Sequence, residues 1–134
     1  MSIRPQYHFR RTATGLDAFN VSRLIQPSRA LPTMTINPNT LAELDTNHWY
    51  MDTSQQPTPR SVLEHMQLIE QCDLSYPIIL DAAGRIMDGM HRVYRAVYEG
   101  YSRIEAKQFT DDPVPDFVNS SPQDLPYNPA LFRL

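Results

Sequence analysis

Apolar residues recur at helical spacing in two segments of the chain. In the first segment, the residues that share one helical face are Val62, Met66 and Ile69. Thr58 can cap this helix and Pro59 suits its first position, so we expect it to run from there to Cys72. In the second segment, the apolar face consists of Val93, Ala96 and Val97. This helix is predicted to begin directly after Gly89 and to end before Gly100, which stands where a left-handed residue closes a helix.

Strand-like runs flank these two helices. Residues 76–80 and 85–88 enclose a turn that contains Gly84, which predicts a β-hairpin. Residues 102–109 alternate between apolar and polar side chains, as a strand does. Residues 33–36 lie between two prolines and are rich in β-branched side chains, which predicts a further short strand. The fold class is therefore expected to be α+β, with a small mixed sheet and helices packed on it.

The ends of the chain are patterned more weakly than its centre. Residues 16–25, between a glycine and a proline, predict a short helix. We expect an N-terminal arm over residues 1–30, one compact domain over residues 31–110, and a proline-rich tail over residues 111–134 that packs on that domain. Before the helix predicted to begin at Pro59, residues 41–49 predict a turn of helix or a loop.

Composition narrows the classes of function. The chain has 134 residues, a formal net charge of −3 and a single cysteine. The acidic balance argues against a large nucleic-acid footprint, and one cysteine excludes an internal disulfide framework and a zinc site built on cysteine pairs. No apolar run is long enough to span a bilayer, and the basic N-terminus has no apolar signal region, so we expect a cytoplasmic protein without a membrane partner.

One segment combines several features of an anion site. Asp88, Gly89, Met90, His91 and Arg92 join a predicted strand directly to a helix start. The glycine allows a tight turn or close approach of a ligand, and the N–H groups of a helix start attract anions. His91 and Arg92 add donors suited to phosphate, and Asp88 is a hard oxygen ligand suited to Mg²⁺. An ordinary glycine cap followed by exposed polar residues is the alternative interpretation.

Residues 57–109 resemble the ParB/sulfiredoxin superfamily. The matching pieces occur in the superfamily's order: Pro59 and Arg60, the run 77–80, the run 84–89, His91 and Arg92, Ala96 and Gly100. Met90 stands where sulfiredoxin has its cysteine, which excludes sulfiredoxin chemistry. Partitioning proteins carry Glu at that place, and the segment after residue 109 is too short for their helix-turn-helix, so DNA clamping is not expected. The Gly-x-His-Arg form is nearest to the free-serine kinase branch.

The resemblance implies a fold and a set of site residues. It implies that nucleotide phosphates lie between two helix starts, held by Arg60, Ser61 and the segment 88–92. It also implies Mg²⁺ with ATP, ADP or CTP, with Asp88 as a candidate metal ligand. The kinase branch uses a Glu near its first strand as the base, for which Glu43 is the positional counterpart and Asp45 the second candidate.

Several of these residues also have ordinary structural interpretations. Glu43 and Asp45 fit a solvated acidic turn as well as a catalytic base or a Mg²⁺ ligand. Trp49, Tyr50 and Met51 fit a pocket wall that stacks on a base or substrate, and equally a part of the core. His65 fits a partly buried helix histidine better than a transition-metal site with His91 and Asp88, which would require these three side chains to converge.

Two classes of function stay open. In the first, the protein is a nucleotide-dependent phosphotransferase that acts on a hydroxyl group of a small molecule. In the second, it is a non-catalytic module in which a nucleotide orders a loop or a homodimer interface that a protein partner recognises. A nuclease or DNA-binding role is the least favoured class because the chain is acidic.

Overall fold

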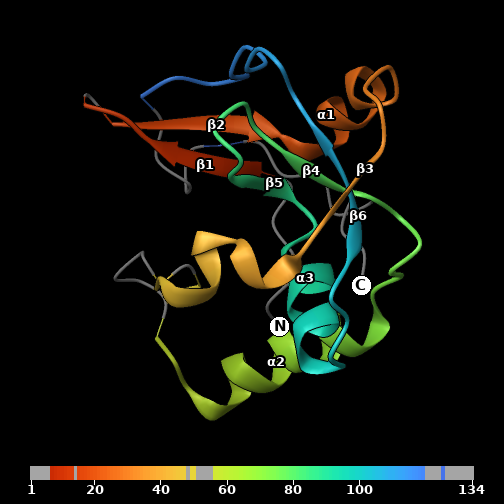
Figure 1. Ribbon diagram of the computed structural model, residues 1–134. Coiled ribbons are helices and arrows are strands. Elements are labelled where there is room, and N and C mark those ends of the chain that lie inside the picture. Colours follow the sequence, from red (N-terminus) through yellow and green to blue (C-terminus); the bar gives the residue numbers. More distant parts are fainter. Residues whose placement is uncertain (1–6, 14, 48, 51–55, 120–124, 126–134) are drawn as a thin grey trace.

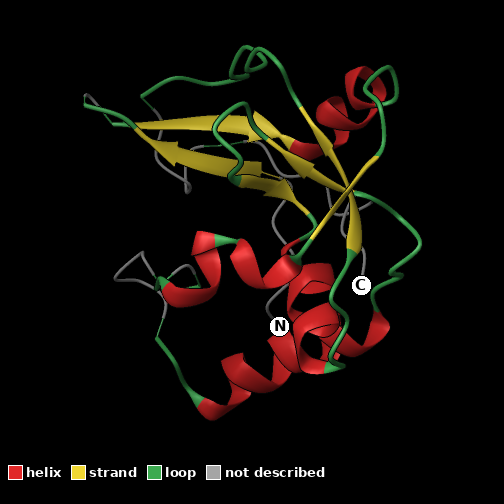
Figure 2. Ribbon diagram, viewed as in Figure 1, coloured by secondary structure: helices red, strands yellow, loops and turns green. Residues whose placement is uncertain are grey.

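The structure is a computed structural model, and it describes residues 7–13, 15–47, 49–50, 56–119 and 125. Figure 1 gives the order of the elements along the chain, and Figure 2 separates helices from strands. Helices and strands occur in both halves of the described chain, so the predicted α+β class is confirmed.

A four-stranded sheet forms the centre of the fold. Its strands lie in the order β3 (Met34–Ile36), β6 (Ile104–Gln108), β4 (Ile78–Leu80) and β5 (Ile86–Asp88). β4 runs parallel to β6, and the other two pairings are antiparallel. The sheet is therefore mixed, and the predicted hairpin is the β4–β5 pair.

Two helices pack below this sheet in the view of Figure 1. α2 (Pro59–Gln71) starts at Thr58, whose side chain accepts a hydrogen bond from the Ser61 N–H, and it ends at Cys72 as predicted. α3 (Met90–Tyr98) follows β5 without a loop. Gly89 precedes α3 with a φ of 100°, and Gly100 follows it with a φ of 82°. Both glycines therefore occupy the left-handed region, as the sequence predicted for Gly100.

The described residues between 7 and 30 differ in part from the prediction. β1 (Tyr7–Arg11) and β2 (Leu16–Asn20) form an antiparallel hairpin, and α1 (Val21–Ser28) follows. The helix predicted over residues 16–25 was therefore wrong for its first half. Residues 16–20 pair with β1, and the Asn20 side chain then caps α1 by accepting the Ser22 N–H. Pairing with the preceding strand β1 overrides the local helical spacing here.

Alternate side chains of the sheet enter two different core clusters. The cluster on the α3 side contains Leu41, Ile78, Leu80, Ile86, Val93 and Ala106. The cluster on the β1–β2 and α1 side contains Phe19, Leu24, Ile79, Met87 and Phe109. Because neighbouring residues of β4 and β5 point to opposite faces, the sheet is covered on both faces, and this explains why both strands are almost wholly apolar.

Charged contacts hold the N-terminal hairpin to the sheet. Arg10 Nη2 lies 2.7 Å from Asp81 Oδ2 and Arg10 Nη1 lies 3.0 Å from Asp112 Oδ2. Asp81 also accepts hydrogen bonds from the N–H groups of Ala83 and Arg85, so it closes the β4–β5 turn as well. Part of the expected tail lies against the same hairpin, where the Asp116 carboxylate accepts the Asn20 N–H at 2.6 Å.

The connection between β3 and α2 contains two short 3-10 helices, η1 (Pro38–Thr40) and η2 (Ala42–Asp45). A turn of helix was one of the two forms predicted for residues 41–49, and η2 supplies it. Residues 56–58 have no regular structure, while Met51 and the other residues up to 55 lie outside the described part. Within the described ranges, no helix is long and apolar enough to cross a membrane.

Candidate functional site

Gly89 makes a turn that no other residue would fit. Its φ of 100° is left-handed, and a Cβ placed on it would lie 2.6 Å from Ile78 Cγ2 and 2.7 Å from Arg92 Nη2. Both distances are shorter than atoms can approach without displacement. The turn therefore needs glycine for its backbone conformation and for the close packing of Ile78 and Arg92 against it.

Arg92 points back along the turn rather than into solvent. Its Nη2 donates to Asp88 Oδ2 at 3.1 Å and to the Pro77 carbonyl at 3.4 Å. The two paired side chains are only 14% and 9% exposed, and Arg92 Nε is buried without an acceptor among the described residues. A phosphate that binds this guanidinium must therefore compete with the Asp88 carboxylate.

His91, in the first turn of α3, is hydrogen-bonded to His65 in the middle of α2. His65 Nδ1 lies 3.0 Å from His91 Nε2, so one of the two nitrogens donates and the other accepts. Burial lowers the pKa of His65, while the charge of Glu64 opposes that shift more weakly. His65 is therefore neutral at pH 7.

Trp49 covers this imidazole pair. Its ring stacks on His65 with a centroid distance of 3.8 Å and an interplanar angle of 4°. The Tyr94 ring meets Trp49 edge to face at 5.2 Å, and the Tyr50 hydroxyl lies 3.1 Å from Ser61 Oγ at the start of α2. These contacts connect residues 49–50 to both helices.

An open cleft of about 300 Å³ lies beside Trp49, and we call it the aromatic cleft. Its lining includes Glu43, Leu44, Asn47, Trp49, Tyr50 and Tyr94. Burial, and to a smaller extent the charge of Glu43, raises the pKa of Tyr94 to about 12. Tyr94 therefore remains a neutral phenol at every physiological pH, while Glu43 gives the cleft a negative charge.

The two candidate bases have different surroundings. Glu43 Oε2 accepts the Ile86 N–H at 2.7 Å, so this carboxylate is tied to the sheet as well as lining the cleft. Asp45 is exposed at the end of η2 and does not line the cleft. Of the pair, only Glu43 is placed beside the aromatic side chains.

The structure brings together some of the predicted phosphate residues. Ser61 lies one helical turn before His65, which contacts His91, so the starts of α2 and α3 share one surface. Arg60 is exposed at the second position of α2, and Met90 packs against the core on the α3 side. Asp88 lies at the end of β5 beside Arg92. Gly89 joins these elements.

His65 and Tyr94 are parts of this site that the sequence did not assign to it. The four-residue spacing of Ser61 and His65 does place both on one face of a helix. No sequence signal pairs His65 with His91, because their contact depends on how α2 packs on α3. Tyr94 was not among the residues predicted for the site.

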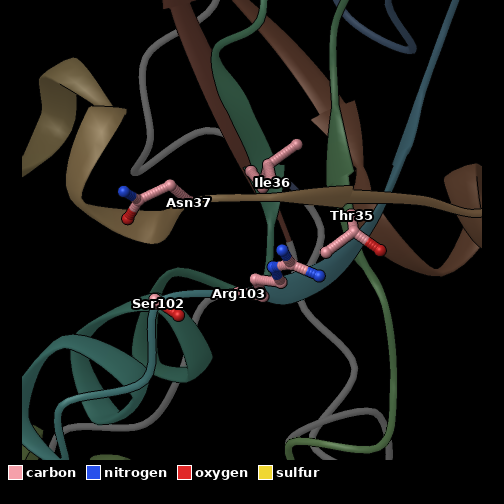
Figure 3. A pocket seen from close by; sticks show the side chains of 5 residues that line it. All are labelled: Thr35, Ile36, Asn37, Ser102 and Arg103. Atoms are coloured by element: carbon pink, nitrogen blue, oxygen red, sulfur yellow. The ribbon is translucent and has the colours of Figure 1, made fainter.

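A second hollow, of about 510 Å³, lies between the end of β3 and the residues before β6 (Figure 3). Figure 3 shows the side chains that line it, Thr35, Ile36, Asn37, Ser102 and Arg103. It is polar, and none of the predicted site residues lines it. The aromatic cleft and the start of α3 therefore remain the better candidates for the functional site.

Comparison of the chain with protein-family models, curated proteins and solved structures gives no match. The similarity to the ParB/sulfiredoxin superfamily therefore stays a prediction from the sequence, and the function has to be argued from the geometry of the site.

Proposed function

We propose that this protein binds the phosphate groups of a nucleotide at the start of α3. The observation that carries the proposal is the contact between His65 and His91 at 3.0 Å, because it joins the middle of α2, one turn after Ser61, to the first turn of α3. Each helix start presents N–H groups that the helix itself cannot satisfy, and it carries a positive partial charge. Two such ends on one surface, with imidazole donors between them, suit an anion.

Arg92 supports the same proposal, provided that its guanidinium can leave Asp88 to bind the phosphate. Its guanidinium packs against Gly89 and is paired with Asp88 at 3.1 Å. Because a phosphate and the Asp88 carboxylate would compete for one fork of donors, binding requires Arg92 to exchange partners. Replacement of Asp88 by Asn should then ease the binding of phosphate in the absence of Mg²⁺.

Mg²⁺ fits this surface only as an ion brought by the nucleotide. Within the described residues, no three His, Cys, Asp or Glu side chains gather as a metal site. Asp88 offers one carboxylate, and Arg92 competes for it. Since Mg²⁺ at nucleotide sites takes one or two carboxylates and the phosphates themselves, Asp88 would be its protein ligand and would fix the position of the phosphate groups.

Phosphoryl transfer to a hydroxyl group would need a base within reach of that hydroxyl, so the substrate would have to extend from the phosphate surface past Trp49 to the aromatic cleft. Glu43 is the better placed of the two carboxylates, because it lines the aromatic cleft. Positioning and charge neutralisation would supply most of the rate enhancement in such a reaction. In this catalytic form of the proposal, Glu43 would accept the proton of the substrate hydroxyl.

One contact favours a binding module without turnover as the second candidate. Glu43 Oε2 is already the acceptor for the Ile86 N–H at 2.7 Å, which is a structural use of the same carboxylate. In this second candidate, the nucleotide orders a homodimer interface or the surface that a protein partner recognises. Both candidates are compatible with the cytoplasmic location expected from the sequence, and neither involves DNA.

Calorimetric titration with ATP, ADP and CTP, each with Mg²⁺, tests the proposal. His91→Ala should weaken binding by about tenfold, since a charge-assisted hydrogen bond contributes about 1.5 kcal/mol or more. Arg85→Ala is the matched control, because Arg85 is an exposed arginine in the β4–β5 turn. No binding to any of the three nucleotides, or equal losses in both variants, would contradict the proposal. A turnover assay with hydroxyl compounds then separates the two candidates.

A further inference from the structure

Three aromatic rings line the aromatic cleft, and Trp49 stands nearly perpendicular to the other two. Trp49 meets Tyr50 at a centroid distance of 6.2 Å and an angle of 90°, and it meets Tyr94 at 5.2 Å and 83°. The faces of aromatic rings carry partial negative charge and attract cations, most strongly at Trp. Because both tyrosine rings stand nearly perpendicular to the indole, the ring faces around the cleft are turned in more than one direction.

The charged side chain that lines the cleft is also negative, like the faces of the aromatic rings. Glu43 is the only ionised side chain among the described residues that line the cleft, and no Lys, Arg or His belongs to that set. Its position is fixed by the hydrogen bond from the Ile86 N–H to Oε2 at 2.7 Å. A carboxylate held rigidly beside aromatic faces repels phosphate and attracts a positively charged group.

The cleft is separated from the phosphate surface by the indole of Trp49. Trp49 lines the cleft and stacks on His65 at 3.8 Å, while His65 itself does not line it. The volume of about 300 Å³ is at the lower end of the range for small-molecule sites. Because the cleft is acidic and aromatic, it suits a ligand other than the phosphate groups that suit the neighbouring surface.

We propose that the aromatic cleft binds a small organic cation, an alkylammonium or quaternary ammonium compound, between Trp49, Tyr50 and Tyr94, with Glu43 as the counter-ion. Leu44 adds an apolar wall for the alkyl groups of such a compound. The proposal does not rest on nucleotide binding, because none of the residues assigned to the phosphate lines this cleft.

Trp49 is the single tryptophan of the chain, so its fluorescence reports on the cleft directly. The experiment is a titration of the full chain, at about pH 7.5 and constant ionic strength, with tetramethylammonium, methylammonium and choline chloride. Sodium chloride and 3,3-dimethylbutanol, the uncharged analogue of choline, serve as control ligands. We expect at least one of the ammonium probes to give a saturable change, and the two control ligands to give none.

Variants test the assignment of each wall. Glu43→Gln keeps an acceptor for the Ile86 N–H and should weaken the binding of the ammonium probe by about tenfold, the loss expected for one charged contact. Asp45→Asn removes a carboxylate two residues away that does not line the cleft, and should change the affinity by less than about twofold. Tyr94→Leu should weaken binding, whereas Tyr94→Phe keeps the ring and should not.

Three results would overturn the proposal. The first is that none of the three ammonium probes gives a saturable response. The second is that the uncharged analogue binds as tightly as choline. The third is that the Glu43→Gln variant binds the ammonium probe as tightly as the wild type while its circular dichroism shows that it is folded like the wild type. Calorimetry with nucleotides on the same samples reports on the phosphate surface separately, so either proposal can fail without the other.

Discussion

His65 Nδ1 and His91 Nε2 lie 3.0 Å apart, so one hydrogen bond joins the middle of α2 to the first turn of α3. Trp49 stacks on the first of these rings at 3.8 Å and holds it against the second. Protonation of His65 would place a positive charge on a half-buried imidazole that is already hydrogen-bonded to His91. The packing of the two helices should therefore depend on pH.

The pH dependence has a definite sign. Burial holds the pKa of His65 below its usual value near 6.5 in the folded state. The unfolded chain therefore binds more protons than the folded chain once the pH falls below about 6.5, and the free energy of unfolding decreases there. Urea unfolding between about pH 8 and pH 5 should show this decrease, with little change above neutral pH.

His65→Phe is the variant that isolates this effect. It keeps a ring for Trp49 to stack on but has no group that titrates. At about pH 8 the comparison with wild type measures packing and the lost hydrogen bond alone. Below about pH 6.5 the wild type should lose stability more steeply than the variant. Parallel curves over the whole range would show that His65 is not the group responsible.

Gly89 and Gly100 form a matched pair for a second prediction. Both are left-handed, with φ of 100° and 82°, but a Cβ on Gly89 would lie 2.6 Å from Ile78 Cγ2, whereas a Cβ on Gly100 would meet no atom within 4 Å. Gly100→Ala should cost about 1 kcal/mol of unfolding free energy, the usual penalty for a left-handed alanine. Gly89→Ala should cost about 2 kcal/mol more, because Ile78 and Arg92 must move.

Chemical denaturation of the two alanine variants measures this difference. A similar cost in both would mean that the atoms around Gly89 relax freely. In that case the close packing of Arg92 against the turn would not be a constraint, and the guanidinium could leave Asp88 at little cost.

The sequence predicted the central elements well because their signals are local. Thr58 before Pro59 fixes the start of α2, and Gly89 and Gly100 enclose α3, as the structure has them. β4 and β5 were recognised from apolar runs around a turn with Gly84. In each case the residues that decide the structure lie within a few positions of each other.

The N-terminal hairpin and the histidine contact could not be predicted in that way. Residues 16–20 carry a spacing that suits a helix, and only their pairing with β1 makes them a strand. Similarly, His65 and His91 are separated by a hairpin, and their contact depends on how two helices cross. The predicted role of Arg92 also needs its partner Asp88, four residues away, to be taken into account. Of the three, only the histidine contact, across 26 positions, is non-local. The hairpin and the Asp88–Arg92 pair join residues close in sequence, but residue spacing alone does not reveal either pairing.

Glu43 gives a third prediction, which separates its structural use from its charge. The Ile86 residue is buried, and its N–H donates to Glu43 Oε2 at 2.7 Å. Glu43→Ala leaves that donor without an acceptor and should cost about 2 kcal/mol, within the range for an unsatisfied buried group. Glu43→Gln keeps an acceptor and should cost less than half as much.

Thermal or urea unfolding of these variants tests the prediction, and Asp45→Asn is the control. Asp45 is exposed, so its replacement should change the free energy of unfolding by no more than about 0.5 kcal/mol. If Glu43→Ala proved as stable as Asp45→Asn, the contact with Ile86 would contribute nothing. Glu43 would then be available entirely for ligand or substrate.

The fourth prediction concerns the attachment of the N-terminal hairpin through Arg10. Its guanidinium bridges Asp81 Oδ2 at 2.7 Å and Asp112 Oδ2 at 3.0 Å, and it lies over the Phe19 ring at 5.1 Å. The Asp81 side chain is 2% exposed, while that of Arg10 is 23% exposed. Arg10→Ala leaves a buried carboxylate with its backbone donors only, and should cost about 2–3 kcal/mol, less than for a fully buried pair.

Two comparisons decide whether this loss comes from the bridge. Arg11→Ala removes the neighbouring exposed arginine and should be nearly neutral. A double-mutant cycle between Arg10→Ala and Asp112→Asn should give a small coupling energy, since Asp112 is 38% exposed, whereas the cycle with Asp81→Asn should give a larger one. Equal coupling to both carboxylates would mean that burial of Asp81 does not set the strength of the contact. The hairpin would then be held mainly by the apolar packing of Phe19 against the sheet, and Arg10 would contribute orientation rather than stability.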